Sequence, residues 1–288
     1  MNEVSDILEE GVTGGQVATD VVTAHLNHEF KGPFAELEFK EWFNRDTWAQ
    51  DDPEIVEAVK KTFLIPPPKE PYALSLSNAV KQNPSDGQVQ AVEKYLRKLT
   101  PGFFIESGAN DGELNSNTIW LEKELGWEGL LVEADPYVFS KLRKKNRKAW
   151  LANVCLSGYT YPKEVTFYRN PVSSEAGGLI YDPYYGAIVP VGAQSIPLYT
   201  LLLALNRTTV DFFSLDVEGN ELQILKTIPF DKITFKILTI EHLFVEEGKR
   251  ALWTFMKSKG YILYKTIKTK MTGDSIFVHP SVLKLLPS

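Results

Sequence analysis

The sequence predicts an α/β fold with a mostly parallel sheet covered by helices on both faces. From Gln88 onward, short apolar runs typical of buried strands alternate with amphipathic runs typical of helices. Carboxylates end several of these apolar runs, a pattern expected where a parallel sheet presents a ligand site. The composition, 43% hydrophobic with 12% aromatic residues, suffices for a core and excludes global disorder.

Charge and composition narrow the class of protein. The 288 residues carry 31 Lys and Arg against 37 Asp and Glu, a net charge of -6. The single cysteine, Cys155, excludes an internal disulfide framework and a cysteine-rich zinc site. The sequence has no apolar run as long as the roughly 18 residues that a membrane-spanning helix needs. The first residues, Met1–Glu10, lack the features of a secretory signal peptide. We therefore expect a soluble, cytoplasmic protein.

The chain is expected to divide unevenly. Residues 1–84 are irregular in pattern and predict an extension or cap with helices at Phe34–Phe43 and Glu54–Phe63. Asp52-Pro53 is a typical helix start, and the prolines at 66–68 favour extended chain after the second helix. Residues 85–288 form the predicted α/β domain.

Turn and cap residues set the elements of that domain. Gly126 and Gly260 end predicted helices, and Pro136 suits a first helical position. The last two strands are close in sequence, so they are expected to pair antiparallel at one edge of the sheet. The fourth strand, Val165–Tyr168, is expected at an edge or in a hairpin. The predicted helices are Gln88–Leu99, Thr118–Leu125, Pro136–Lys145, Pro197–Leu205, Glu221–Thr227 and Arg250–Lys259, and the predicted strands are Phe103–Glu106, Gly129–Glu133, Ala149–Val154, Val165–Tyr168, Asp211–Asp216, Phe235–Glu241, Tyr261–Tyr264 and Ser275–His279.

The first strand of this domain ends in a loop suited to a ligand. Its two glycines would let the backbone approach a bound molecule closely. The loop lacks the Gly-x-Gly-x-x-Gly of dinucleotide sites, and its carboxylates would repel phosphate. A ligand with a cationic group and a neutral sugar fits better than NAD or ATP, although a plain strand-to-helix turn is the alternative. The candidate residues are Glu106, Gly108, Ala109, Asn110, Asp111 and Gly112.

The next two strand ends complete a predicted nucleoside pocket. Glu133, followed by Ala134, ends the second strand, where a carboxylate commonly binds a ribose diol. Asn153 ends the third strand and could face an adenine edge.

Further acidic residues follow two later strands. Asp216, Glu218 and Glu221 lie within six residues, and like charges so close disfavour one another in a buried turn. Glu241-His242 ends the next strand, and His242 is a candidate base, with a core or capping histidine as the alternative. A divalent metal is compatible with these ligand types, but no spacing requires one.

These motifs together resemble the FkbM-type family of S-adenosylmethionine-dependent methyltransferases. The resemblance runs from Gln88 to His279 and is most specific in the Asp-Val-Glu-Gly-Asn-Glu run at 216–221. Bacterial members often open the first loop with Asp, where this chain has Glu106. The sequence motif Ile240-Glu241-His242 is similar to the corresponding motif of the animal Star-like branch.

The resemblance implies a class I methyltransferase fold with seven strands, the last reversed. It implies that Glu106 and its loop bind the methionine end of S-adenosylmethionine, that Glu133 binds the ribose, and that Asp216 forms the pocket floor. The expected reaction is O-methylation of a small-molecule or glycan-like acceptor, with His242 as base beside Asp216 or Glu241.

Some alternatives stay open at this level. A Star-like protein could be a non-catalytic binding module for trafficking of growth-factor precursors, in the lumen of the endoplasmic reticulum or Golgi. Tyr184 lies in a glycine-rich loop that is either a lid over the acceptor, and then a substrate contact, or an ordinary surface loop. The basic cluster at 141–148 is interpreted as a solvated face, and no nucleic-acid partner is expected.

Overall fold

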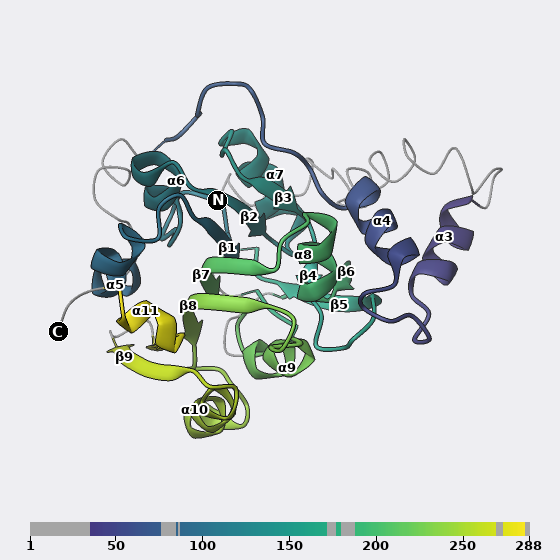
Figure 1. Cartoon of the computed structure of the whole chain (residues 1–288). Helices are drawn as coiled ribbons and strands as arrows, with labels where there is room; N and C mark the ends of the chain where they lie inside the picture. The colour runs from purple at the N-terminus through teal and green to yellow at the C-terminus, as the bar shows by residue number, and fades with distance from the viewer. Residues whose placement is uncertain are drawn as a thin grey trace.

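Figure 1 shows the fold of the chain in a computed structural model. The structure describes residues 35–75, 85, 87–171, 177–179, 188–268 and 273–285. Within these ranges no helix combines the length and hydropathy that a membrane crossing requires. The glycine-rich loop residue Tyr184 lies outside the described residues.

A seven-stranded sheet forms the centre of the molecule in the order β3-β2-β1-β7-β8-β10-β9. The pairs from β3 to β8 are parallel, and β10 pairs antiparallel with both β8 and β9. The two last strands therefore pair antiparallel at one edge, as predicted. The strands are β1 Phe103–Ser107, β2 Glu128–Val132, β3 Trp150–Ala152, β7 Thr209–Leu215, β8 Thr234–Glu241, β9 Ile262–Lys268 and β10 Gly273–Val278.

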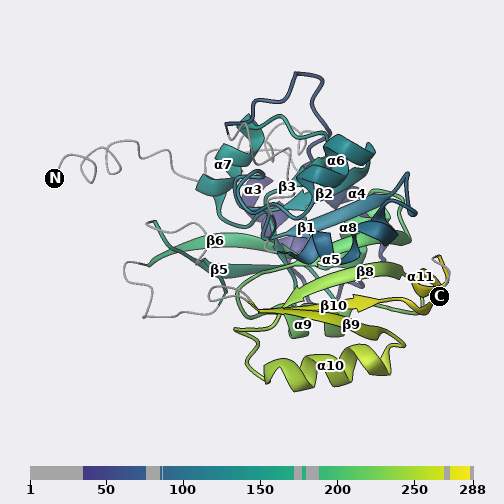
Figure 2. The same cartoon turned by 90° about the vertical axis from the view of Figure 1, so that its left-hand side faces the viewer.

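Helices pack on both faces of this sheet and form two apolar clusters with it (Figures 1 and 2). One face is covered by α3 Ala35–Phe43, α4 Pro53–Thr62, α8 Leu198–Ala204, α9 Glu221–Thr227 and α10 Gly248–Ser258. The other face is covered by α5 Gln88–Leu96, α6 Ile119–Leu125, α7 Pro136–Lys144 and α11 Pro280–Leu283.

A second sheet of three strands, in the order β4-β6-β5, was not predicted. It contains β4 Cys155–Leu156, β5 Lys163–Arg169 and β6 Val189–Ile196. The fourth predicted strand corresponds to β5, which pairs antiparallel with β6 as one arm of a hairpin-like pair. Figure 2 shows β5 and β6 projecting beyond the main sheet.

The segment before the predicted α/β domain packs against the same core. Phe43 and Ile55 are fully buried in the cluster that also contains Phe213 of β7. Ile65 then forms an antiparallel bridge with Leu151 of β3, with both backbone N–H···O distances at 2.9 Å.

Candidate active site

The loop after β1 brings the ends of three strands into contact. Gly108 has φ of 80°, and a Cβ built on it would lie 1.8 Å from the backbone oxygen of Asp216. The N–H groups of Gly108 and Ala109 both donate to the Val132 oxygen at 3.1 Å. Only glycine fits such an approach, so Gly108 joins the ends of β1, β2 and β7.

Glu106 points into this loop. It is buried and accepts hydrogen bonds from Ser116 Oγ at 2.8 Å, Asn117 N at 2.5 Å and Thr118 Oγ1 at 2.6 Å. Burial raises the pKa of its carboxyl group, while the Arg147 guanidinium and these donors lower it. The direct partners of Glu106 are thus loop residues, and its effect on a ligand would be transmitted through residues 116–118.

The basic cluster beside α7 is a solvated face only in part: Lys141, Arg143 and Lys144 are exposed, whereas Lys145 and Arg147 bind residues of the fold. Arg147 is fully buried, pairs with Glu122 at 3.0 Å and donates to the Gly112 oxygen. Lys145 lies 2.6 Å from Glu113 Oε2 and 3.4 Å from Asp111 Oδ2. These cations hold the first loop in place because they bind its carboxylates and carbonyls.

Glu133 is held where the first loop meets the end of β2. Its Oε2 accepts from Asn110 N and its Oε1 from Asp135 N, both at 2.8 Å. Burial raises the pKa of Glu133 to about 8, although these backbone donors lower it. The Asn153 side-chain amide donates to the backbone oxygens of Glu133 and Ala134, so it braces this turn.

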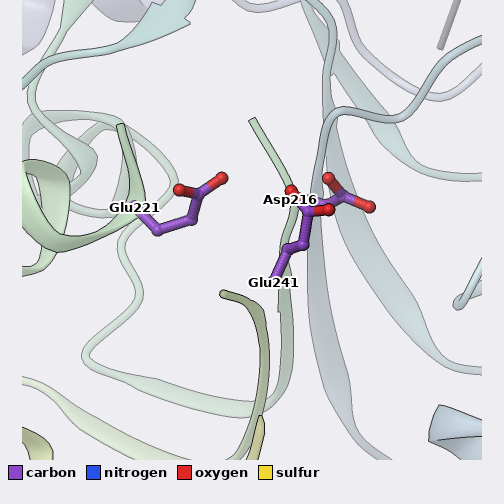
Figure 3. Close-up of side chains that lie close together, drawn as sticks. All are labelled: Asp216, Glu221 and Glu241. Atoms are coloured by element: carbon purple, nitrogen blue, oxygen red, sulfur yellow. The ribbon is translucent and has the colours of Figure 1, made fainter. Parts of the chain in front are cut away.

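Three carboxylates meet at the ends of β7 and β8 (Figure 3). One oxygen from each of Asp216, Glu221 and Glu241 lies within 4.8 Å of the other two. Glu221 is fully buried and accepts from Val217 N at 2.9 Å and Gly219 N at 3.1 Å, which fixes the turn before α9. Burial, reinforced by the Asp216 charge, raises the pKa of Glu241 to about 12.

His242 follows Glu241 but contacts other residues. Successive strand side chains point to opposite faces, and the His242 N–H still donates to the Gly273 oxygen at 2.8 Å. His242 Nδ1 lies 3.0 Å from Ser275 Oγ, which also accepts from Trp253 Nε1 at 2.7 Å. Burial, with Lys249 and Lys268, lowers the pKa of His242. The structure thus brings Asp216 and Glu241 together and directs His242 to Ser275.

Several residues around the site were not anticipated from the sequence. Asn117 donates to Ser214 Oγ at 2.9 Å, and its own Oδ1 is buried without a hydrogen-bond partner among the described residues. The polar run at 115–118 after the first loop was the signal available for it. A Cβ on Gly178 would lie 3.2 Å from the Glu218 Cβ, so the segment bridged to Tyr168 of β5 borders the acidic turn.

The strand order and the single reversed strand define a class I methyltransferase fold. The methyltransferase FkbM domain matches residues 106–263, more than half of the chain. The chain therefore belongs to the FkbM family of S-adenosylmethionine-dependent methyltransferases.

The comparisons with other proteins are more distant. No curated protein matches the chain. Among solved structures, the human methyltransferase 10 domain containing protein has a TM-score of 0.39 and 15% identity, over 78% of this chain and 95% of that one. A putative RNA methyltransferase from Pyrococcus horikoshii has a TM-score of 0.38 and 14% identity, over 78% and 94%. With TM-scores this low, neither similarity carries an argument about substrate.

Proposed function

We propose that the protein binds S-adenosylmethionine at the ends of β1, β2 and β3 and methylates a hydroxyl group of a small-molecule or glycan-like acceptor. The observation that carries the proposal is the environment of Glu133. A carboxylate has about four acceptor positions, and the backbone N–H groups of Asn110 and Asp135 donate to one oxygen each, with the N–H of Ala134 also acting on the charge. Each oxygen keeps acceptor capacity that suits the hydroxyls of a ribose, whose hydrogen bonds would stabilise the charged carboxylate.

Residues outside the first loop support the other end of the same ligand: Asn117 in the segment after that loop, and Gln88 at the start of α5. Asn117 Oδ1 and Gln88 Oε1 are buried acceptors without a hydrogen-bond partner among the described residues. Buried acceptors of this kind favour a bound donor, and the ammonium group of the cofactor's methionine end is one. Glu106 and Arg147 would keep the 116–118 segment in position for it.

The reaction is expected to follow the usual stoichiometry of methyl transfer. S-adenosylmethionine supplies a methyl group on a sulfonium, so the new O–C bond forms as the S–C bond breaks, leaving S-adenosylhomocysteine and a proton. We assign that proton to His242. In the tautomer that donates from Nδ1 to Ser275 Oγ, His242 Nε2 carries the free lone pair. The lowered pKa keeps this ring neutral and able to accept a proton near pH 7.

Calorimetric titration of the full chain with S-adenosylhomocysteine tests the binding site. We expect binding by the wild type and about tenfold weaker binding by Glu133→Gln, because a paired hydrogen bond to the ribose is lost. Glu128→Gln is the matched control, since Glu128 starts the same strand and is exposed at the surface. No binding by the wild type, or equal binding by Glu133→Gln, contradicts the proposal.

Transfer is tested with methyl-labelled S-adenosylmethionine and separate acceptor pools. The proposal expects label in hydroxyl-bearing sugars and small alcohols. Label in RNA or in amine acceptors would contradict the acceptor class. If the protein binds the cofactor but transfers label to none of the pools, the proposed enzymatic activity is contradicted and a binding module is favoured.

A further inference from the structure

The carboxylates at the ends of β7 and β8 form an arrangement that the nucleoside pocket does not explain. Glu241 is only 5% exposed, and its Oε2 has no hydrogen-bond partner among the described residues. The groups that act most on its charge are other carboxylates, those of Asp216, Glu218 and Glu221. A buried oxygen without a partner is rare in folded proteins and is usually explained by a bound water, a proton shared with a neighbour or an ion.

The geometry of the three carboxylates fits a hard cation. Their ligand oxygens lie within 4.8 Å of one another. Calcium binds oxygens at about 2.3–2.6 Å, so two oxygens on opposite sides of it are about 5 Å apart. Magnesium and manganese require a slightly tighter group, and all three cations prefer carboxylates. Figure 3 shows the Glu241 and Asp216 carboxylates close together, with the Glu221 carboxylate directed toward them.

The two strands and the turn hold these ligands rigidly. Glu221 is fixed by the N–H groups of Val217 and Gly219, which leave its oxygens with further lone pairs. Asp216 is fixed at its backbone, where its N–H donates to the Ser107 oxygen at 3.1 Å. Neither Glu221 nor Glu241 forms an ion pair with a Lys, Arg or His in the part of the chain that the structure describes. No described basic side chain therefore occupies the place that a cation would take beside this pair.

We propose that Asp216, Glu221 and Glu241 form a binding site for one divalent cation at the ends of β7 and β8. Three protein oxygens leave coordination positions for water or for a hydroxyl oxygen. In a role that rests on the proposed function, a cation held here would bind the acceptor hydroxyl and lower its pKa. His242 is not among these ligands, since its ring is directed to Ser275.

Manganese titration of the chelator-treated full chain tests this site directly, with the electron paramagnetic resonance signal of free Mn²⁺ as readout. We expect about one Mn²⁺ per chain, displaced by Ca²⁺. Glu241→Gln and Asp216→Asn should each weaken binding by about tenfold or more, because each removes a charged ligand. Glu246→Gln is the matched control, since Glu246 is an exposed acid shortly after the same strand.

The outcomes separate the cation site from the proposed function. Circular dichroism establishes that each variant is folded before its titration is interpreted. No Mn²⁺ binding by the wild type at millimolar concentration, or unchanged binding by both ligand variants, overturns the site and leaves a shared proton as the occupant. Binding of S-adenosylhomocysteine without Mn²⁺ binding overturns the cation site alone. If the protein binds Mn²⁺ but does not bind S-adenosylhomocysteine, the cation site stands and the proposed function is overturned.

Discussion

The two halves of the strand-end edge differ in the hydrogen bonding of one buried carboxylate, Glu241, although Glu221 beside it accepts from backbone donors as Glu106 and Glu133 do. At β1 and β2, Glu106 and Glu133 each accept hydrogen bonds from nearby loop donors. At β7 and β8, Glu241 faces other carboxylates, and one of its oxygens has no partner among the described residues. Burial of a carboxylate requires donors, a proton or a cation. The first half therefore satisfies its buried carboxylates with protein donors, whereas the second half leaves one buried carboxylate oxygen without a donor among the described residues.

The junction of the two halves gives the largest expected effect. Gly108→Ala would place a Cβ against the Asp216 backbone oxygen at a positive φ. Backbone atoms cannot move aside as a flexible side chain can, so we expect a loss on the order of 4 kcal/mol or more in unfolding free energy. Urea unfolding followed by circular dichroism measures it.

The control for this substitution is Gly260→Ala. Gly260 has φ of 85° but no heavy atom within 4 Å of a built Cβ. The Gly260→Ala variant should lose only about 1 kcal/mol of unfolding free energy, which is the cost of placing alanine in the left-handed conformation. Equal losses at the two positions would show that the junction is not a close contact.

Arg147→Met is expected to have the next largest effect and to act on the β1 half. It leaves Glu122 buried without its ion partner, which costs about 3–5 kcal/mol. Arg207→Met breaks an exposed pair with Glu128 and should cost about 1 kcal/mol or less. Thermal and urea unfolding compare the two, and similar losses would refute the role of Arg147 in the loop.

Glu133→Gln has a smaller effect with a defined pH dependence. The folded pKa of Glu133, about 8, lies above its ordinary 4.5, so the folded protein keeps a proton that the unfolded chain releases between these values. The contribution of Glu133 to the free energy of unfolding therefore decreases as the pH rises from 4.5 to about 8. The Asp135 charge raises the pKa, and the N–H groups of Asn110, Ala134 and Asp135 lower it. The glutamine variant should match the wild type in melting temperature near pH 4.5 and exceed it above pH 8.

The smallest effect concerns His242. Its pKa lies below the ordinary 6.5 because of burial and the charges of Lys249 and Lys268, so its contribution to stability is lost as pH falls below 6.5. Lys249→Gln should raise the His242 pKa by a fraction of a unit in an NMR titration. Lys226→Gln is the control, since Lys226 pairs with Glu247. A shift of equal size in the control would contradict the assignment.

The regular part of the fold could be predicted because its signals are local. Gly126 and Pro136 stand at the helix ends where cap chemistry places them. The second sheet could not be predicted in the same way. Strand β6, Val189–Ile196, contains Pro190 and Gly192 and is only partly buried, so it lacks the alternation of a half-buried strand.

The candidate site was predictable in position and less so in contacts. Parallel topology alone brings Asp216 and Glu241 to one edge of the sheet. Sequence order does not determine which way Glu106 or His242 turns, because their partners Thr118 and Ser275 are chosen by loop conformation and strand pairing. Arg147 was misinterpreted because a buried cation in a basic run is visible only through its partner across the fold.

The bridge between Ile65 and Leu151 has a consequence for the exposed edge of the main sheet. Strand β3 is the last strand on its side of the main sheet, and an open edge of this kind is a template for pairing with another chain. The segment that carries Ile65 covers part of this edge with two backbone hydrogen bonds. The hydrogen-bonding groups of Leu151 are thus already occupied within the chain and are not available for pairing with a strand of another molecule.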